Sequence, residues 1–173
     1  MERNYRQDRG FTLVELLIVV AIIAVLAAIA VPALLRARAA ANEAGAIGDL
    51  RSVSAGEATY ASANAGAYGM ITCLNTPAAC GFAAATIPFI DAQLASLQPK
   101  QGYARSFLAG PAGGGQPDPG LTAFVYAATP ITLGVSGTRG FAVDSSARVC
   151  QTANGIVPPL SGAALDQSCQ PLK

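Results

Sequence analysis

The side chains with the greatest capacity for chemistry are one glutamate in an apolar segment and four cysteines. The glutamate is Glu15, close to the start of the run RGFTLVELLIVVAIIAVLAAIAVP, residues 9–32. An ionised carboxylate costs about 3 kcal/mol or more at the centre of a bilayer. A charge buried in an apolar assembly is tolerated when it is paired. The sequence therefore predicts that Glu15 has a partner.

A cut between Gly10 and Phe11 would create such a partner. The new α-amino group of Phe11 would lie four residues before Glu15, one helical turn away on the same face. The pair can form within one chain, but two staggered chains suit it better, because each amine can neutralise the neighbouring carboxylate. Glu15 is then predicted to set the register of identical packed helices.

The four cysteines are Cys73, Cys80, Cys150 and Cys169, and all of them follow the apolar segment. An even number in an exported region favours disulfides in an oxidising compartment over reduced cysteines in a cytosolic core. Four cysteines allow three pairings, which the sequence leaves open. Zinc fits poorly, since there is no Cys-x-x-Cys pair and no histidine.

The chain offers little for catalysis or cofactor binding. Without histidine it lacks the commonest general base and metal ligand. The stretch GPAGGGQPDPG, residues 110–120, lacks the Gly-Lys-Ser/Thr end of a phosphate loop and predicts a strand connection. Asp118, Asp144 and Asp166 lack the dense spacing of a calcium loop and are predicted to be solvated surface acids. We predict no enzyme activity, no cofactor and no metal, and a net charge of +1 gives no strong nucleic-acid signal.

The apolar run is long enough to span a membrane. From Leu16 to Leu35 no residue is charged, and 20 helical residues rise about 30 Å, which matches a bilayer core. Arg3, Arg6 and Arg9 precede the run and predict a cytoplasmic N-terminus.

Two simpler interpretations of the run compete with a cut at Gly10. It is a cleaved secretory signal, with Ala28–Ala30 as a small-residue cleavage site, or it is a plain single-span anchor. The apolar part is longer than the usual ~7–15 residues of a signal peptide. Neither interpretation explains Glu15.

The helix is predicted to continue to about residues 61–65. Small and apolar residues recur there at spacings of three or four and predict one buried stripe, with Asn42, Glu43 and Asp49 mostly off it. The stripe comprises Ala40, Ala44, Ile47, Leu50, Ser54, Ala58 and Ala61. Pro32 removes one helical hydrogen bond, and it is either a kink or a weak point used during assembly.

Two arginines follow the apolar run, Arg36 and Arg38. They are predicted to meet lipid phosphates or, in an assembly, Glu43 or Asp49 of a neighbouring subunit. The residues themselves do not separate these two alternatives.

The second half of the chain is predicted to form a small antiparallel sheet. Strand-like runs at residues 102–108, 121–128 and 140–149 are each bounded by Gly, Pro or Asp, and a short helical piece is possible at 90–97. The apolar face of this sheet would cover the helix stripe. The fold class is thus α+β: a long N-terminal helix, its first half transmembrane, packed against a small antiparallel β-sheet head.

The N-terminal motif resembles that of type IV prepilins. The family has a short charged leader ending in Gly and then Phe-Thr-Leu-x-Glu before an apolar helix. Here these are Arg9-Gly10, Phe11 to Glu15, and the run from Leu16. The ten-residue leader is of the type IVa kind, and Pro32 falls where those pilins carry a helix-interrupting proline. The resemblance is strong over roughly residues 6–62.

The resemblance implies a structural subunit of a pilus-like filament. A prepilin peptidase would cut after Gly10 and methylate the amine of Phe11, and Glu15 would serve subunit docking. The subunit would wait in the inner membrane as a single-span protein until an ATPase-driven platform assembled it into a helical homo-oligomer at the cell surface. Such pili serve adhesion, twitching motility or DNA uptake. The family also favours a C-terminal disulfide loop, and with it the sequence-local pairing of the cysteines.

These expectations divide the chain into a cleaved leader (1–10), a transmembrane and filament-core helix (11–35), its amphipathic continuation (36–65) and an α+β head with a disulfide loop (66–173). One alternative is a pseudopilin of a type II secretion system, which would build a periplasmic pseudopilus. The major pseudopilin usually has a calcium site and an Asp-Pro-Trp-Gly stretch, whereas this chain has no tryptophan. The other alternative is a minor pilin.

Overall fold

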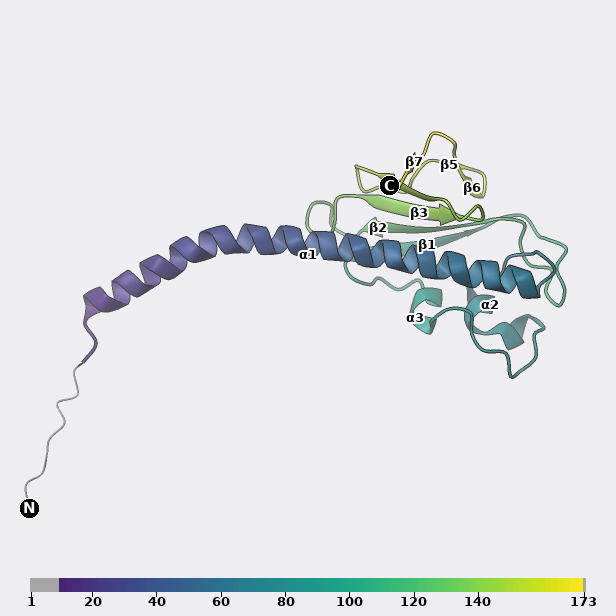
Figure 1. The fold of residues 1–173 in the computed structure, drawn as a ribbon, viewed down its shortest axis with the longest axis horizontal. Helices are drawn as coiled ribbons and strands as arrows, with labels where there is room; N and C mark the ends of the chain where they lie inside the picture. Colours follow the sequence, from purple (N-terminus) through teal and green to yellow (C-terminus); the bar gives the residue numbers. More distant parts are fainter. Residues whose placement is uncertain (1–9, 173) are drawn as a thin grey trace, which may run out of the picture. The chain divides into compact units, whose positions relative to one another are not determined.

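The computed structural model of the chain describes residues 10–172. It divides the chain into two compact units, one up to Ala37 and one from Arg38 onward. A single helix, α1 (Leu13–Ala63), begins in the first unit and ends in the second (Figure 1). The helix end agrees with the predicted 61–65. Within the second unit, α1 packs against a small antiparallel sheet, so the predicted α+β class is confirmed.

Short helices and two sheets follow α1. The helical pieces are α2 (Ile71–Asn75), the 3₁₀ turn η1 (Pro77–Cys80) and α3 (Ala92–Ala95). The strands are β1 (Tyr103–Ala109), β2 (Phe124–Pro130), β3 (Gly140–Asp144), β4 (Val149–Thr152), β5 (Leu160–Ser161), β6 (Ala164–Leu165) and β7 (Gln170–Pro171). Strands β1-β2-β3-β4-β7 form one antiparallel sheet in that order, and β5 and β6 pair separately.

One predicted strand, residues 140–149, is wrong because it is two strands joined by a turn. Strand β3 ends at Asp144 and β4 starts at Val149. The Asp144 carboxylate accepts hydrogen bonds from the backbone and hydroxyl of Ser146, and the Ala147 N–H donates to the Asp144 carbonyl. Aspartate commonly starts such turns because its side chain bonds the backbone two residues on.

The main sheet is covered on both faces. Alternate residues of β2 and β3 point to opposite sides: Tyr126 and Val143 join the core under α1, whereas Val125 and Ala142 lie under the C-terminal loop. This explains why the first five residues of β2 are all buried. Figure 1 shows α1 and the yellow C-terminal segment on either side of the strands.

The buried stripe of α1 differs from the predicted one. Of the predicted positions Leu50 and Ala61 are buried, but Ala40, Ala44 and Ala58 are exposed. The buried residues are Glu43, Ala46, Asp49, Leu50, Val53, Gly56, Glu57, Tyr60 and Ala61. The pattern of apolar residues misplaced the stripe because three of its members are carboxylates, whose partners come from the head.

Glu43 and Asp49 are both paired within the same chain, which favours the other alternative for Arg36 and Arg38, contact with lipid phosphates, over pairing with these two acids of a neighbour. Glu43 accepts hydrogen bonds from the backbone N–H of Thr138 at 2.8 Å and from Nε of Arg139 at 2.8 Å. Burial raises the pKa of Glu43, but these hydrogen bonds outweigh it, so the pKa is lowered.

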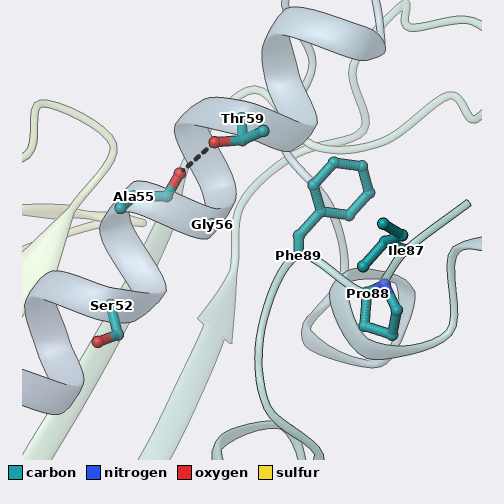
Figure 2. Close-up of a pocket in the computed structure, with 7 residues that line it drawn as sticks. All are labelled: Ser52, Ala55, Gly56, Thr59, Ile87, Pro88 and Phe89. Atoms are coloured by element: carbon teal, nitrogen blue, oxygen red, sulfur yellow. Dashed lines mark hydrogen bonds between the residues drawn. The ribbon is translucent and has the colours of Figure 1, made fainter.

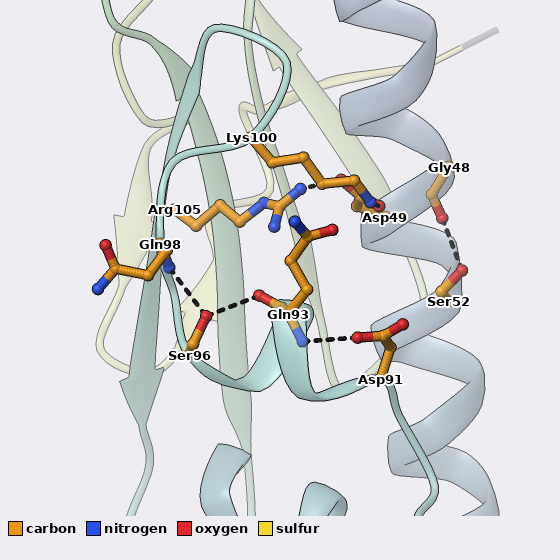
Figure 3. A network of polar contacts seen from close by, with 9 residues as sticks. All are labelled: Gly48, Asp49, Ser52, Asp91, Gln93, Ser96, Gln98, Lys100 and Arg105. Atoms are coloured by element: carbon orange, nitrogen blue, oxygen red, sulfur yellow. Dashed lines mark hydrogen bonds and ion pairs between the residues drawn. The ribbon is translucent and has the colours of Figure 1, made fainter.

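Asp49 bridges α1 to the start of the sheet. It accepts a hydrogen bond from Nζ of Lys100 at 2.9 Å and forms an ion pair with the buried Arg105 of β1 (Figure 3). Removing either cation would leave a buried charge less well compensated, which is costly. These contacts fix the register between the helix and the sheet.

The predicted surface acids are also corrected in part. Asp144 is buried, and its second oxygen accepts a hydrogen bond from the Leu165 N–H. Asp118 is half-buried and accepts a hydrogen bond from the Tyr60 hydroxyl at 2.8 Å. These two carboxylates stabilise loops of the head.

Candidate processing and assembly site

The first residues of α1 form a reciprocal helix cap. The Thr12 N–H and hydroxyl donate to the Glu15 carboxylate at 2.9 and 2.8 Å, and the Glu15 N–H donates to the Thr12 hydroxyl at 3.2 Å. This is a capping box, which satisfies N–H groups that the first helical turn leaves unpaired. Glu15 also places negative charge at the positive end of the helix dipole.

The capping role of Thr12 is a feature that the reasoning from charge missed. Its signal was present in the sequence, since Thr-x-x-Glu ahead of an apolar run is the usual mark of a capping box. The box also places the Glu15 carboxylate next to the predicted cut. The N–H that it binds belongs to Thr12, one residue after Phe11.

The bond predicted to be cut is accessible. Gly10 and Phe11 are both exposed and lie before the first helical residue, Leu13. A Cβ atom added at Gly10 would meet no other atom within 4 Å, and the φ angle of Gly10 lies outside the left-handed region. The fold itself therefore does not require glycine at this position.

Beyond the cap, the first unit exposes a large apolar surface. Every large apolar side chain from Leu13 to Leu35 is exposed, with between 46% and 74% of its surface accessible. Isolated soluble proteins rarely expose apolar patches of this size. The helix is long and apolar enough to cross a membrane. Such a surface needs lipid or other helices around it.

Pro32 lies inside this apolar part of α1. The helix continues through it without a break, and Nε of Arg36 donates to the Pro32 carbonyl at 3.3 Å. The missing N–H of proline leaves one carbonyl in the preceding turn without its usual helical donor. Its use in assembly stays a prediction.

The cysteines lie in the second unit, remote in sequence from the cap. The structure joins Cys73 to Cys80 and Cys150 to Cys169, which is the sequence-local pairing. The first disulfide links α2 to η1. The second links β4 to the segment before β7 and lies in the core on the sheet face away from α1.

The head also has an open groove between α1 and residues 87–89 (Figure 2). It is lined by Ser52, Ala55, Gly56, Thr59, Ile87, Pro88 and Phe89. None of these side chains titrates near neutral pH. The hydroxyl of Thr59 donates to the Ala55 carbonyl at 2.9 Å, so it is engaged within the helix. The groove therefore has none of the acid, base or activated nucleophile that catalysis needs.

A comparison with protein families identifies the N-terminal segment. Residues 5–31 match the prokaryotic N-terminal methylation motif. The chain carries the class III signal peptide of type IV pilins. The match covers the predicted cut, the cap and most of the apolar run. No curated protein and no solved structure matches the chain.

The motif and the fold together make the chain pilin-like. The methylation motif belongs to prepilins, which in general are processed by a prepilin peptidase and assembled into filaments, and which are structural subunits rather than enzymes. The apolar helix near the N-terminus fits a single-pass inner-membrane anchor for such a protein.

Proposed function

We propose that this protein is the structural subunit of a type IV pilus-like filament, cut after Gly10 and methylated on the amine of Phe11. The observation that carries the proposal is the methylation motif at residues 5–31, with an exposed cut site at its Gly-Phe junction. Because the fold does not need glycine at position 10, recognition by a peptidase accounts best for that residue. The leader is then residues 1–10.

The apolar helix, residues 11–35, has two successive environments in this proposal. It first crosses the inner membrane and then packs against the same helix of other subunits in the filament core. Both environments cover a surface that is apolar on all sides. An ATPase-driven platform in the inner membrane moves the subunit from one to the other, and the head ends at the cell surface.

Glu15 has two roles that belong to different stages. In the unprocessed chain its carboxylate caps α1 through Thr12. After the cut, its charge is available to pair with the methylated amine of Phe11 on a neighbouring subunit. Pairing is what makes a carboxylate tolerable in an apolar filament core.

The first test is mass spectrometry of the N-terminal peptide from material sheared off the cell surface. A methylated peptide that starts at Phe11 is expected. A chain found in membranes alone and starting at Met1 would indicate a plain anchor, and one starting at Val31 a secretory signal. A processed chain confined to the periplasm would indicate the pseudopilin alternative. Gly10→Val should leave the leader attached, with Gly48→Ala as a matched glycine control.

A second test separates the two roles of Glu15. Glu15→Gln keeps an acceptor for the Thr12 N–H but removes the charge, whereas Thr12→Ala removes the capping hydroxyl and keeps the charge. We expect Glu15→Gln and Glu15→Val to insert in the membrane but to be absent from filaments, and Thr12→Ala to be incorporated. Normal incorporation of Glu15→Gln would refute the charge-pairing role.

A further inference from the structure

The main sheet ends in an edge strand that lacks the usual protection against pairing with another chain. Strand β1 is the first in the order β1-β2-β3-β4-β7, so it pairs with β2 on one side. Its ladder with β2 runs without a bulge over all seven residues of β1. Natural proteins usually shorten, bulge or charge such strands, often with lysine or proline. β1 contains neither residue, and its one charged side chain, Arg105, is buried and paired with Asp49.

The backbone groups of Phe107 and Ala109 point to the open side of β1. Hydrogen bonds alternate between the two sides of an antiparallel strand. Hydrogen bonds of 2.9 Å join both Gly102 and Gly110 to the residues that flank β2, so the even-numbered residues of β1 bond to β2. The N–H and carbonyl groups of Phe107 and Ala109 therefore face the other side. Among the residues that the structure describes, they have no backbone partner there.

Leu108 lies at the middle of this open stretch. The side chain of Phe107 packs against the core under α1, so the side chain of Leu108 lies on the opposite face of the sheet. Leu108 exposes 43% of its surface. Its partner across the ladder is Val125, which is buried in the core on that face. Leu108 is thus an exposed continuation of a buried apolar cluster.

The open edge is complementary to a second copy of itself. When two β1 strands meet antiparallel with Leu108 opposite Leu108, Phe107 of each chain lies opposite Ala109 of the other. The four residues then exchange four backbone hydrogen bonds, and the two leucines face each other with Cα atoms about 4.5 Å apart. Self-pairing also brings like charges together, which is destabilising. Residues 106–115 contain no charged side chain, so this edge meets no such repulsion.

The other edge of the same sheet is a poorer partner. It is β7, which has two residues, and its Pro171 has no N–H to donate. A contact between β1 of one chain and β7 of the next would therefore form fewer backbone hydrogen bonds than the pair of β1 strands. This difference favours the symmetric pairing.

We propose that the edge of β1 is a self-association site, at which two copies of the chain join their sheets through residues 107–109. The pair has two-fold symmetry, whereas neighbouring subunits of a helical filament meet through two different surfaces. The β1 pair therefore joins subunits of two separate filaments side by side. This consequence rests on the proposed function, but the pairing itself does not.

The first measurement is amide hydrogen exchange of the full chain in detergent micelles, followed by NMR at increasing protein concentration. The N–H groups of Phe107 and Ala109 should exchange rapidly at low concentration and become protected at high concentration. The Leu108 N–H is the internal control. It faces β2 by the same alternation and should be protected at every concentration.

Charge exchange at position 108 tests the register. Leu108→Lys and Leu108→Glu each place like charges opposite each other, so each variant alone should lose the concentration-dependent protection. An equimolar mixture of the two should regain it. Ser106→Lys is the matched control, because Ser106 is exposed on the same face of β1 and lies opposite Gly110 of the second copy. This variant should keep the protection.

Several results would overturn the pairing. Rapid exchange of Phe107 and Ala109 at all concentrations would do so, and so would protection at the lowest concentration, because the chain would then cover its own edge. Protection that persists in both charged variants alone would assign the edge to a different partner.

Electron microscopy of sheared material tests the consequence for filaments. Wild-type filaments should lie side by side, and those of Leu108→Lys should lie singly. Single wild-type filaments would overturn the link between filaments. An absence of filaments from both proteins would instead count against the proposed function, and the pairing measured in micelles would stand.

Discussion

Replacing the buried Glu57 should change how the stability of the head depends on pH. Glu57 lies on α1 and has no exposed surface. One carboxyl oxygen accepts a hydrogen bond from the Gly69 N–H at 2.9 Å, and the other has no donor within reach among the residues that the structure describes. Burial raises the pKa of Glu57 to about 8, against the smaller lowering effect of the Gly69 N–H. The folded head therefore holds this carboxyl group neutral at pH 7.

The sign and size of the effect follow from proton linkage. A glutamate in the unfolded chain titrates near its ordinary pKa of 4.5, so between that pH and about 8 the folded state binds one proton more than the unfolded state. The stability contributed by the protonated group is fully present below pH 4.5 and is lost as the pH rises to about 8. The slope is about 1.4 kcal/mol per pH unit, which amounts to roughly 4 kcal/mol between pH 5 and pH 8.

Glu57→Gln should remove this slope. The amide does not ionise, and its oxygen can still accept the Gly69 hydrogen bond. The variant should therefore gain about 4 kcal/mol over the wild type between pH 5 and pH 8, by the same linkage. The assay is urea unfolding of the full chain in detergent micelles at several pH values, followed by circular dichroism. Subtracting the free energy of unfolding of the wild type from that of the variant at each pH removes the contribution of the other titrating groups.

Glu43→Gln is the matched control, because the pKa of Glu43 is lowered in the folded head. The stability that ionised Glu43 contributes is present above pH 4.5 and is lost as the pH falls. The free energy of unfolding of Glu43→Gln should therefore differ most from that of the wild type at neutral pH and least in acid. Parallel pH profiles for Glu57→Gln and the wild type would show that Glu57 is ionised in the folded protein, and the reasoning from burial would be wrong.

Two further predictions concern α1 and the C-terminal loop. Gly56→Ala should destabilise the head by about 1–3 kcal/mol, since its Cβ would meet the backbone of Phe89 at 3.0 Å and overlap Ile90. At Gly48 an added Cβ would meet nothing within 4 Å, so Gly48→Ala should stabilise the head by up to about 1 kcal/mol. If the two variants changed the free energy of unfolding in urea by the same amount, the close packing at Gly56 would be contradicted. Replacing both Cys150 and Cys169 by Ser should cost about 3 kcal/mol from the entropy of loop closure, and an unchanged unfolding midpoint would show that the disulfide does not form.

The N-terminal site could be predicted from the sequence because its chemistry is local. Gly10, Phe11 and Glu15 lie within six residues, and the length of the apolar run sets its capacity to span a membrane. The capping role of Thr12 was equally local and available from the Thr-x-x-Glu spacing. The strand-like run at residues 102–108 likewise predicted β1 (Tyr103–Ala109), because strand periodicity depends on neighbours along the chain.

The sequence by itself predicted the α+β fold class, the N-terminal methylation motif and the end of α1, since each depends on residues that are neighbours along the chain. The tertiary structure decided which face of α1 is buried, because Glu43, Asp49 and Glu57 lie there on account of Arg139, Arg105 and Gly69, residues 12 to 96 positions away. It also decided that Asp144 is interior and that the β2–β3 connection is bonded to Asn42 of α1 through the Ser136 carbonyl. The sequence around a carboxylate is the same whether its side chain faces water or a buried arginine. Only the fold shows which of these two environments the carboxylate occupies.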